Sequence, residues 1–188
     1  MERIWIARLR RLNGWIALAT GALLLGCAGF VLLDIVMRRF GSSLGGTEEI
    51  AGYVMAIATA WGMAYTLLEL GHVRIDLLRA RGGTMARALA DLLAMVALTA
   101  VVTFVAIQAW PVVARSLTNA SRANTPLETP LAWVQIPWFA GWTWFAIMSA
   151  LITCLALSML VRGRAAETEA IIGAFAEQDA FTDKEAAR

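Results

Sequence analysis

Residues 12–33 read LNGWIALATGALLLGCAGFVLL and contain no charged side chain. A helix needs about 20 predominantly apolar residues to cross the roughly 30 Å hydrocarbon core of a bilayer, and this run is long enough. Three more charge-free runs follow, bounded by Glu49 and Glu69, by Asp91 and Arg115, and by Glu128 and Arg162. The pattern predicts an all-α membrane protein with four transmembrane helices plus short interfacial amphipathic segments.

The composition also favours a membrane location. Hydrophobic residues make up 60% of the 188 residues and charged residues only 16%, whereas a soluble domain carries about 25% charge. This length accommodates one compact membrane domain. The net charge of +2 comes largely from arginines at the ends of apolar runs, where topology explains them, so we expect no nucleic-acid partner.

We expect no enzymatic activity, no cofactor and no metal. Cys27 and Cys154 both lie inside apolar runs, where a cysteine acts as a small packing residue. His72 is the only histidine in the sequence, which rules out bis-histidine haem ligation. The sequence has no glycine-rich phosphate loop and no nucleophile with a base beside it, so we assign no catalytic, cofactor-binding or metal residues.

Charged and apolar segments alternate along the chain. The expected order is a basic interfacial segment at 1–12, transmembrane helices at 13–36 and 50–68, a cytoplasmic hinge at 69–87, a third transmembrane helix at 88–110, a periplasmic connection at 111–137, a fourth transmembrane helix at 138–161 and a cytoplasmic tail at 162–188. The first segment is expected either to lie in the interface plane or to be an unstructured positive flank. The tail is expected either to form a short helix or to be disordered.

The N-terminus has some features of a signal peptide, because arginines precede an apolar run. Leu24-Leu25-Gly26-Cys27 even resembles a lipoprotein cleavage site. The apolar run continues past Cys27 to Leu33, however, where a processed lipoprotein would turn polar. We therefore expect this segment to be retained as the first helix.

The arginines predict the orientation of the chain. Most of them lie in the N-terminal segment, the hinge at 69–87 and the start of the tail, so the positive-inside rule places both termini in the cytoplasm. Tryptophans gather on the opposite side, where they are expected at the headgroup level: Trp110, Trp133, Trp138 and Trp142. An aromatic box for a cation or a sugar is the alternative interpretation of these rings.

Small residues recur at four-residue spacing in the second and fourth runs and predict faces for close helix packing. They are Gly52, Ala56, Ala60 and Ala64, and Ala146 and Ala150. None of the apolar runs holds an ionisable residue at mid-depth, which an ion or proton path normally requires. The sequence therefore predicts a membrane scaffold for a larger subunit.

Three motifs taken together resemble the small membrane subunit of tripartite ATP-independent periplasmic (TRAP) transporters. They are DIVMRRFG at 34–41, TEEIA at 47–51 and GHVRIDLL at 71–78. The four-helix plan, the length and the inward-facing termini agree with that family over residues 10–162.

The resemblance implies a non-catalytic small permease subunit of a secondary, sodium-coupled symporter that takes up an organic acid across the bacterial inner membrane. Its partners would be a large multi-helix subunit that carries the substrate and sodium sites, a periplasmic solute-binding protein, and membrane lipid. The small subunit would scaffold the large one and help to dock the binding protein.

Charged residues near the helix ends are the candidate contact residues. Asp34 and Arg38 are spaced i,i+4 and are expected to pair at the outer end of the first helix. Thr47 is a good N-cap residue. Glu48 and Glu49 are expected either to cap the second helix or to contact the binding protein.

His72, Arg74 and Asp76 belong to the hinge that we expect on the cytoplasmic side. They are expected either to fix this segment against the membrane surface or the large subunit, or to lie in a solvated loop.

Two other functions remain open from the sequence. A membrane anchor of a redox enzyme also has about four helices, but it usually needs axial histidines inside the membrane, and His72 lies in a loop segment. A small homo-oligomeric exporter would be expected to carry a buried acidic residue in the middle of a helix.

Overall fold

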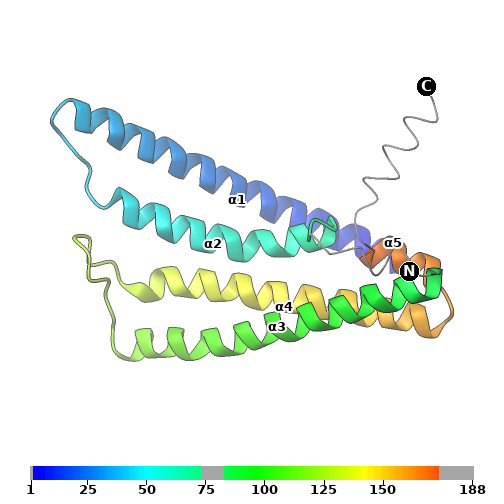
Figure 1. Cartoon of the computed structure of the whole chain (residues 1–188). Coiled ribbons are helices and arrows are strands. Elements are labelled where there is room, and N and C mark those ends of the chain that lie inside the picture. The colour runs from blue at the N-terminus through cyan, green and yellow to red at the C-terminus, as the bar shows by residue number, and fades with distance from the viewer. Residues whose placement is uncertain (1, 73–82, 174–188) are drawn as a thin grey trace, which may run out of the picture. The chain divides into compact units, whose positions relative to one another are not determined.

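The computed structural model describes residues 2–72 and 83–173, and Figure 1 shows its helices. They are α1 (Glu2–Arg39), α2 (Thr47–Leu68), α3 (Thr84–Thr118), α4 (Leu131–Val161) and α5 (Ala165–Ile172). Each of the first four is long and apolar enough to cross a bilayer, which confirms the predicted fold class. The regular structure of the described residues is helical, with one isolated bridge between Arg122 and Pro130.

Helix α1 is one continuous element from Glu2 to Arg39, with no break between residues 12 and 13. The separate N-terminal segment expected at 1–12 is therefore continuous with the first transmembrane helix. Asn13 lies at this junction inside the helix, and its side-chain amide donates to the Leu9 carbonyl at 3.0 Å. A continuous helix pairs its own backbone N–H and C=O groups by hydrogen bonds. A break at membrane depth would leave some of these groups without partners.

The four long helices end in the same way. At the end of α1, Ser42 N–H donates to Met37 O at 3.1 Å and Gly41 N–H donates to Arg38 O at 3.2 Å, which is the Schellman pattern. This pattern requires a left-handed residue, and Gly41 supplies it with φ +81°. The corresponding residues after α2, α3 and α4 are Leu70, Ala120 and Gly163.

Helices α3 and α4 are both longer than expected at the ends that face the connection between them. Pro111 does not end α3, which continues to Thr118, and Pro137 lies inside α4, which begins at Leu131. A proline removes one backbone hydrogen bond from a helix, and neighbouring helices often make this tolerable in membranes. The connection between the two helices is correspondingly shorter than the predicted 111–137.

The chain divides into two compact units, of which Met1–Tyr65 and Val101–Ile147 form the first. In this unit α2 approaches α4 closely, because a Cβ atom at Gly141 would lie 2.8 Å from Ala60 Cβ. Ala60 and Ala64 are fully buried, whereas Gly52 at the other end of the same stripe is exposed. The close packing along α2 is therefore concentrated in its second half.

The second unit comprises Thr66–Ala100 and Met148–Arg188. Its core contains Met95, Met148 and Met159, and Ile172 of the short helix α5 is also buried. Thr99 Oγ1 lies 2.8 Å from Thr153 Oγ1, so one hydroxyl group donates to the other between α3 and α4. This contact satisfies polar groups that would otherwise be isolated among apolar side chains.

Candidate functional site

Asp34 connects the end of α1 to the start of α2. Its Oδ2 atom accepts hydrogen bonds from Arg38 Nε at 2.8 Å and from Thr47 Oγ1 at 2.7 Å. Its Oδ1 atom accepts from Ser43 Oγ at 3.1 Å and from the Leu44 backbone N–H at 2.8 Å. The side chain is only 2% exposed, so this carboxylate fixes the loop from within.

Thr47 therefore has a different role from the expected N-cap. It is the first residue of α2, and its hydroxyl group donates to Asp34 instead of accepting from the helix. The first helical hydrogen bond runs from Ile50 N–H to the Gly46 carbonyl at 3.1 Å. Gly46 is thus the residue at the N-cap position, and Glu48 and Glu49 lie in the first turn, where the helix dipole favours carboxylates.

The loop between α1 and α2 depends on glycines with positive φ. Gly45 and Gly46 have φ angles of +71° and +66°, a region that side chains with a Cβ atom rarely adopt. Leu127, from the loop between α3 and α4, packs directly against Gly46, and a Cβ atom there would clash with it. The absence of a side chain at residue 46 thus lets the two loops meet.

The loop between α3 and α4 has its own hydrogen bonds. Ala123 N–H donates to Thr129 O at 2.9 Å, and Leu131 N–H donates to Ser121 O at 3.0 Å. Arg122 Nη1 also donates to the Glu128 carbonyl at 3.2 Å. The loop therefore forms a short folded hairpin.

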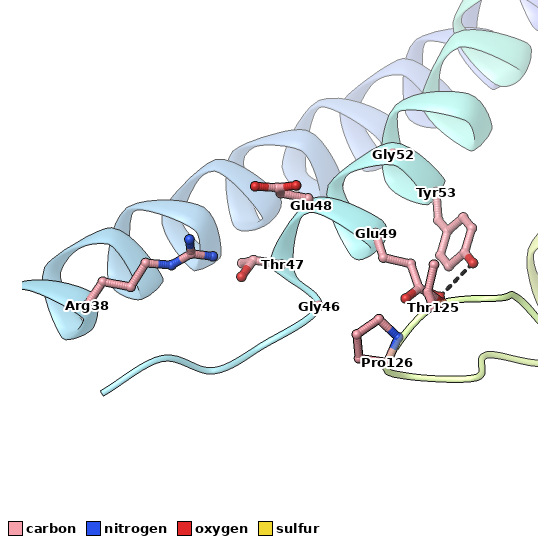
Figure 2. A pocket seen from close by; sticks show the side chains of 9 residues that line it. All are labelled: Arg38, Gly46, Thr47, Glu48, Glu49, Gly52, Tyr53, Thr125 and Pro126. Carbon is pink, nitrogen blue, oxygen red and sulfur yellow. Dashed lines mark hydrogen bonds between the residues drawn. The ribbon is translucent and has the colours of Figure 1, made fainter. Parts of the chain in front are cut away.

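A cavity of about 630 Å³ lies where the two loops meet the first turns of α2 (Figure 2). Nine residues line it: Arg38, Gly46, Thr47, Glu48, Glu49, Gly52, Tyr53, Thr125 and Pro126.

Glu49 lies on the side of this cavity that faces the α3–α4 loop. Its Oε1 atom accepts a hydrogen bond from Tyr53 Oη at 2.7 Å, and its carboxylate lies beside Thr125. Glu48 projects from a different side of the same turn and is exposed. The cavity thus presents carboxylates, a guanidinium group and a phenol hydroxyl group, which can form ion pairs and hydrogen bonds with charged or polar groups.

The other predicted residues do not line this cavity in the described part of the chain. His72 is half-buried and belongs to the second unit, and Arg74 and Asp76 lie outside the described residues. Ala146 and Ala150 are half-buried in α4.

The four predicted interface tryptophans fall into two groups. Trp110 and Trp133 are mostly exposed, whereas Trp138 and Trp142 are half-buried. Two of the rings pack against phenylalanines: Trp110 lies 5.5 Å from Phe139 and Trp142 lies 6.2 Å from Phe145, measured between ring centroids.

Two hydrogen bonds between distant segments were not predicted from the sequence. Trp144 Nε1 donates to Asn13 Oδ1 at 3.0 Å and joins α4 to α1, and Asn13 is fully buried. Trp61 Nε1 donates to the Pro137 carbonyl at 3.0 Å and joins α2 to α4. A lone asparagine at the start of an apolar run was the only sequence signal for the first of these bonds.

The family model of the tripartite ATP-independent periplasmic transporters, DctQ component, matches residues 27–166 of this sequence. The matched region covers α2, α3 and α4 and includes every residue that lines the cavity. Searches of curated proteins and of solved structures gave no significant match.

Proposed function

Since this chain belongs to the DctQ component family of tripartite ATP-independent periplasmic transporters, we propose that it is the non-catalytic scaffold of a sodium-coupled symporter for an organic acid. In this role it holds a large multi-helix subunit in the bacterial inner membrane. The large subunit carries the solute, and a periplasmic solute-binding protein delivers it.

The observation that carries the scaffold role is the family match, and the surface of α1 supports it. The most apolar window of α1 has none of its residues buried against the rest of the described chain. Leu18, Leu25 and Leu32 recur every seven residues on its surface and are each more than half exposed. Such a helix has a broad apolar face available for a membrane partner or for lipid.

We place both termini in the cytoplasm, because the N-terminal segment and the 69–87 segment are rich in arginine. In this orientation the cavity beside Glu48 and Glu49 opens to the periplasm. The binding protein approaches from that side, and the exposed Glu48 carboxylate is placed to meet a basic group on its surface.

Deletion of this chain tests the scaffold role. Cells that lack it, but retain the large subunit and the binding protein, should lose sodium-dependent uptake of the solute, and a plasmid copy should restore it. An affinity tag on the chain should co-purify the large subunit from detergent-solubilised membranes. Uptake that is unchanged by the deletion would contradict the proposal.

Charge reversal tests the docking role separately. Glu48→Lys should weaken binding of the solute-binding protein to the purified two-subunit complex by about 10-fold at low salt, with a smaller effect at high salt. Glu69→Lys is the matched control, because Glu69 is also exposed but follows the opposite end of α2. If both variants bound the solute-binding protein with equal affinity, the cavity would not be part of the docking surface. The scaffold role would be unaffected by this result.

A further inference from the structure

The first turns of α1 carry a pair of arginines that the scaffold and docking roles do not use. Helix α1 runs unbroken from Glu2 to Arg39, and only its stretch at 12–33 is free of charge. At 1.5 Å per residue this stretch is about 33 Å long, so it fills the roughly 30 Å hydrocarbon core by itself. Arg8 and Arg11 are both exposed, and they therefore lie just outside the hydrocarbon, at the depth of the lipid headgroups.

These arginines lie on the side of α1 that faces away from the protein. Asn13 marks the inner side, because it is fully buried and bonded to Trp144 of α4. At 3.6 residues per turn, Arg8, Arg11 and Trp15 fall within about 60° of one another, on the side roughly opposite Asn13. Trp15 is 66% exposed, and Leu12 beside it is also exposed. Guanidinium groups are thus followed by an indole ring and an apolar side chain on one outer face.

This order of side chains matches the order of groups in a phospholipid. Residues three apart on a helix have Cβ atoms about 5–6 Å apart, so the guanidinium groups of Arg8 and Arg11 can both reach one phosphate group. Tryptophan is enriched at the membrane interface, and Trp15 lies one turn deeper than Arg11, where the glycerol backbone of a lipid begins. Leu12 offers an apolar contact to the first methylene groups of an acyl chain.

Charge and depth together select the occupant of this face. Phosphate groups surround a transmembrane helix at the headgroup level on every side, whereas a carboxylate of a partner protein would have to be placed there by its own fold. Phosphatidylethanolamine carries an ammonium group beside its phosphate, which two guanidinium groups repel. Phosphatidylglycerol carries the phosphate without a cation, so it complements the arginine pair better.

We propose that Arg8 and Arg11 bind the phosphate of one anionic phospholipid of the phosphatidylglycerol type, whose glycerol backbone lies against Trp15 and Leu12. The bound lipid ties the first turns of α1 to the headgroup layer. This site needs only that α1 spans the bilayer, so it stands apart from the docking role of the cavity beside Glu48.

Native mass spectrometry of the purified full chain tests this site. The chain in detergent micelles is titrated with phosphatidylglycerol and, separately, with phosphatidylethanolamine that has the same acyl chains, and the dissociation constant of the first bound lipid is measured. Arg11→Gln removes one of the two guanidinium groups. Arg10→Gln is the matched control, because it makes the same change of charge at the neighbouring exposed residue, on another side of the helix.

We expect phosphatidylglycerol to bind more tightly than phosphatidylethanolamine. Arg11→Gln should weaken the binding of phosphatidylglycerol by about 5-fold, which corresponds to about 1 kcal/mol for one arginine beside an anionic lipid. Arg10→Gln should leave this affinity unchanged. Equal affinities for the two lipids, or equal effects of the two substitutions, would overturn the proposal.

Two further measurements identify the occupant. Excess glycerol 3-phosphate should not displace the lipid, because it has the phosphate but lacks the acyl chains. Phosphatidylglycerol should also stay bound when the chain is purified with the large subunit. Displacement by glycerol 3-phosphate would show a site for free phosphate, and loss of the lipid in the complex would show that a protein partner covers the arginines. Either result would overturn the proposal.

Discussion

Asp34 accepts four hydrogen bonds, and the loop between α1 and α2 depends on them. Asp34→Ala would leave Ser43, Thr47 and the Leu44 N–H without their acceptor. We expect this variant to lower the melting temperature of the purified chain by about 5 °C, because buried donors that lose their partner are costly. Tryptophan fluorescence on heating in detergent measures the change.

Arg38→Ala provides the control for this prediction. It removes the other partner of the Asp34–Arg38 ion pair. The Arg38 side chain is 52% exposed, and exposed ion pairs contribute little to stability. The melting temperature of Arg38→Ala should therefore stay close to that of the wild-type chain. If both variants melted alike, the loop would not depend on the buried carboxylate.

The bond between Asn13 and Trp144 is expected to couple α1 to α4 by about 0.6 kcal/mol, the average for interhelical hydrogen bonds in membranes. A double-mutant cycle of Asn13→Leu and Trp144→Phe, followed by reversible unfolding in mixed micelles, measures this coupling. Strictly additive effects of the two substitutions would show that the bond contributes nothing.

At the residue scale, the sequence predicts contacts that are local along a helix. The i,i+4 spacing of Asp34 and Arg38 anticipates the observed pair. The bonds from Ser43 and Thr47 depend on a loop path set by left-handed glycines, which spacing alone does not specify. Asn13 and Trp144 are 131 residues apart, so their bond depends on helix packing.

The crossing of α2 and α4 depends on the lack of a side chain at Gly141. A Cβ atom there would lie 2.8 Å from Ala60 Cβ and 3.0 Å from the Ala60 carbonyl carbon. Gly141→Ala should therefore destabilise the chain by about 1–3 kcal/mol, as overpacking does in other cores. The free energy of unfolding in mixed micelles measures the effect.

Gly62→Ala makes the same chemical change where a Cβ atom meets nothing within 4 Å. There the gain in helix propensity dominates, so stability should rise by about 0.5–1 kcal/mol. The two glycine variants are thus expected to change stability in opposite directions. A stabilising Gly141→Ala would show that α2 and α4 do not approach so closely.

At the element scale, hydropathy predicts that the helices exist but not where they end. Four charge-free runs correspond to α1–α4, because the length of an apolar run sets whether it can span a bilayer. Helices α3 and α4 contain Pro111 and Pro137 and pass the predicted limits at 110 and 138, since the loss of one backbone bond does not outweigh the turns on either side. Helix α1 likewise includes the basic residues of its first turns.

The orientation of the whole molecule can be measured with single cysteines. In a chain with Cys27 and Cys154 replaced by serine, Ser42→Cys and Gly83→Cys place one thiol at each end of the spans, both at exposed positions. The proposed orientation predicts that a membrane-impermeant maleimide added outside spheroplasts labels Ser42→Cys and spares Gly83→Cys. The reverse labelling pattern would invert the topology and move the Glu48 cavity to the cytoplasm.

Reconstitution into liposomes tests the central claim, that this chain is the scaffold of a transporter. Solute uptake is measured under a sodium gradient, with the binding protein outside, for vesicles that contain this chain, the large subunit or both. We expect uptake by vesicles with both subunits and only background uptake by vesicles with this chain alone. Transport by this chain alone, or full transport by the large subunit without it, would contradict the account.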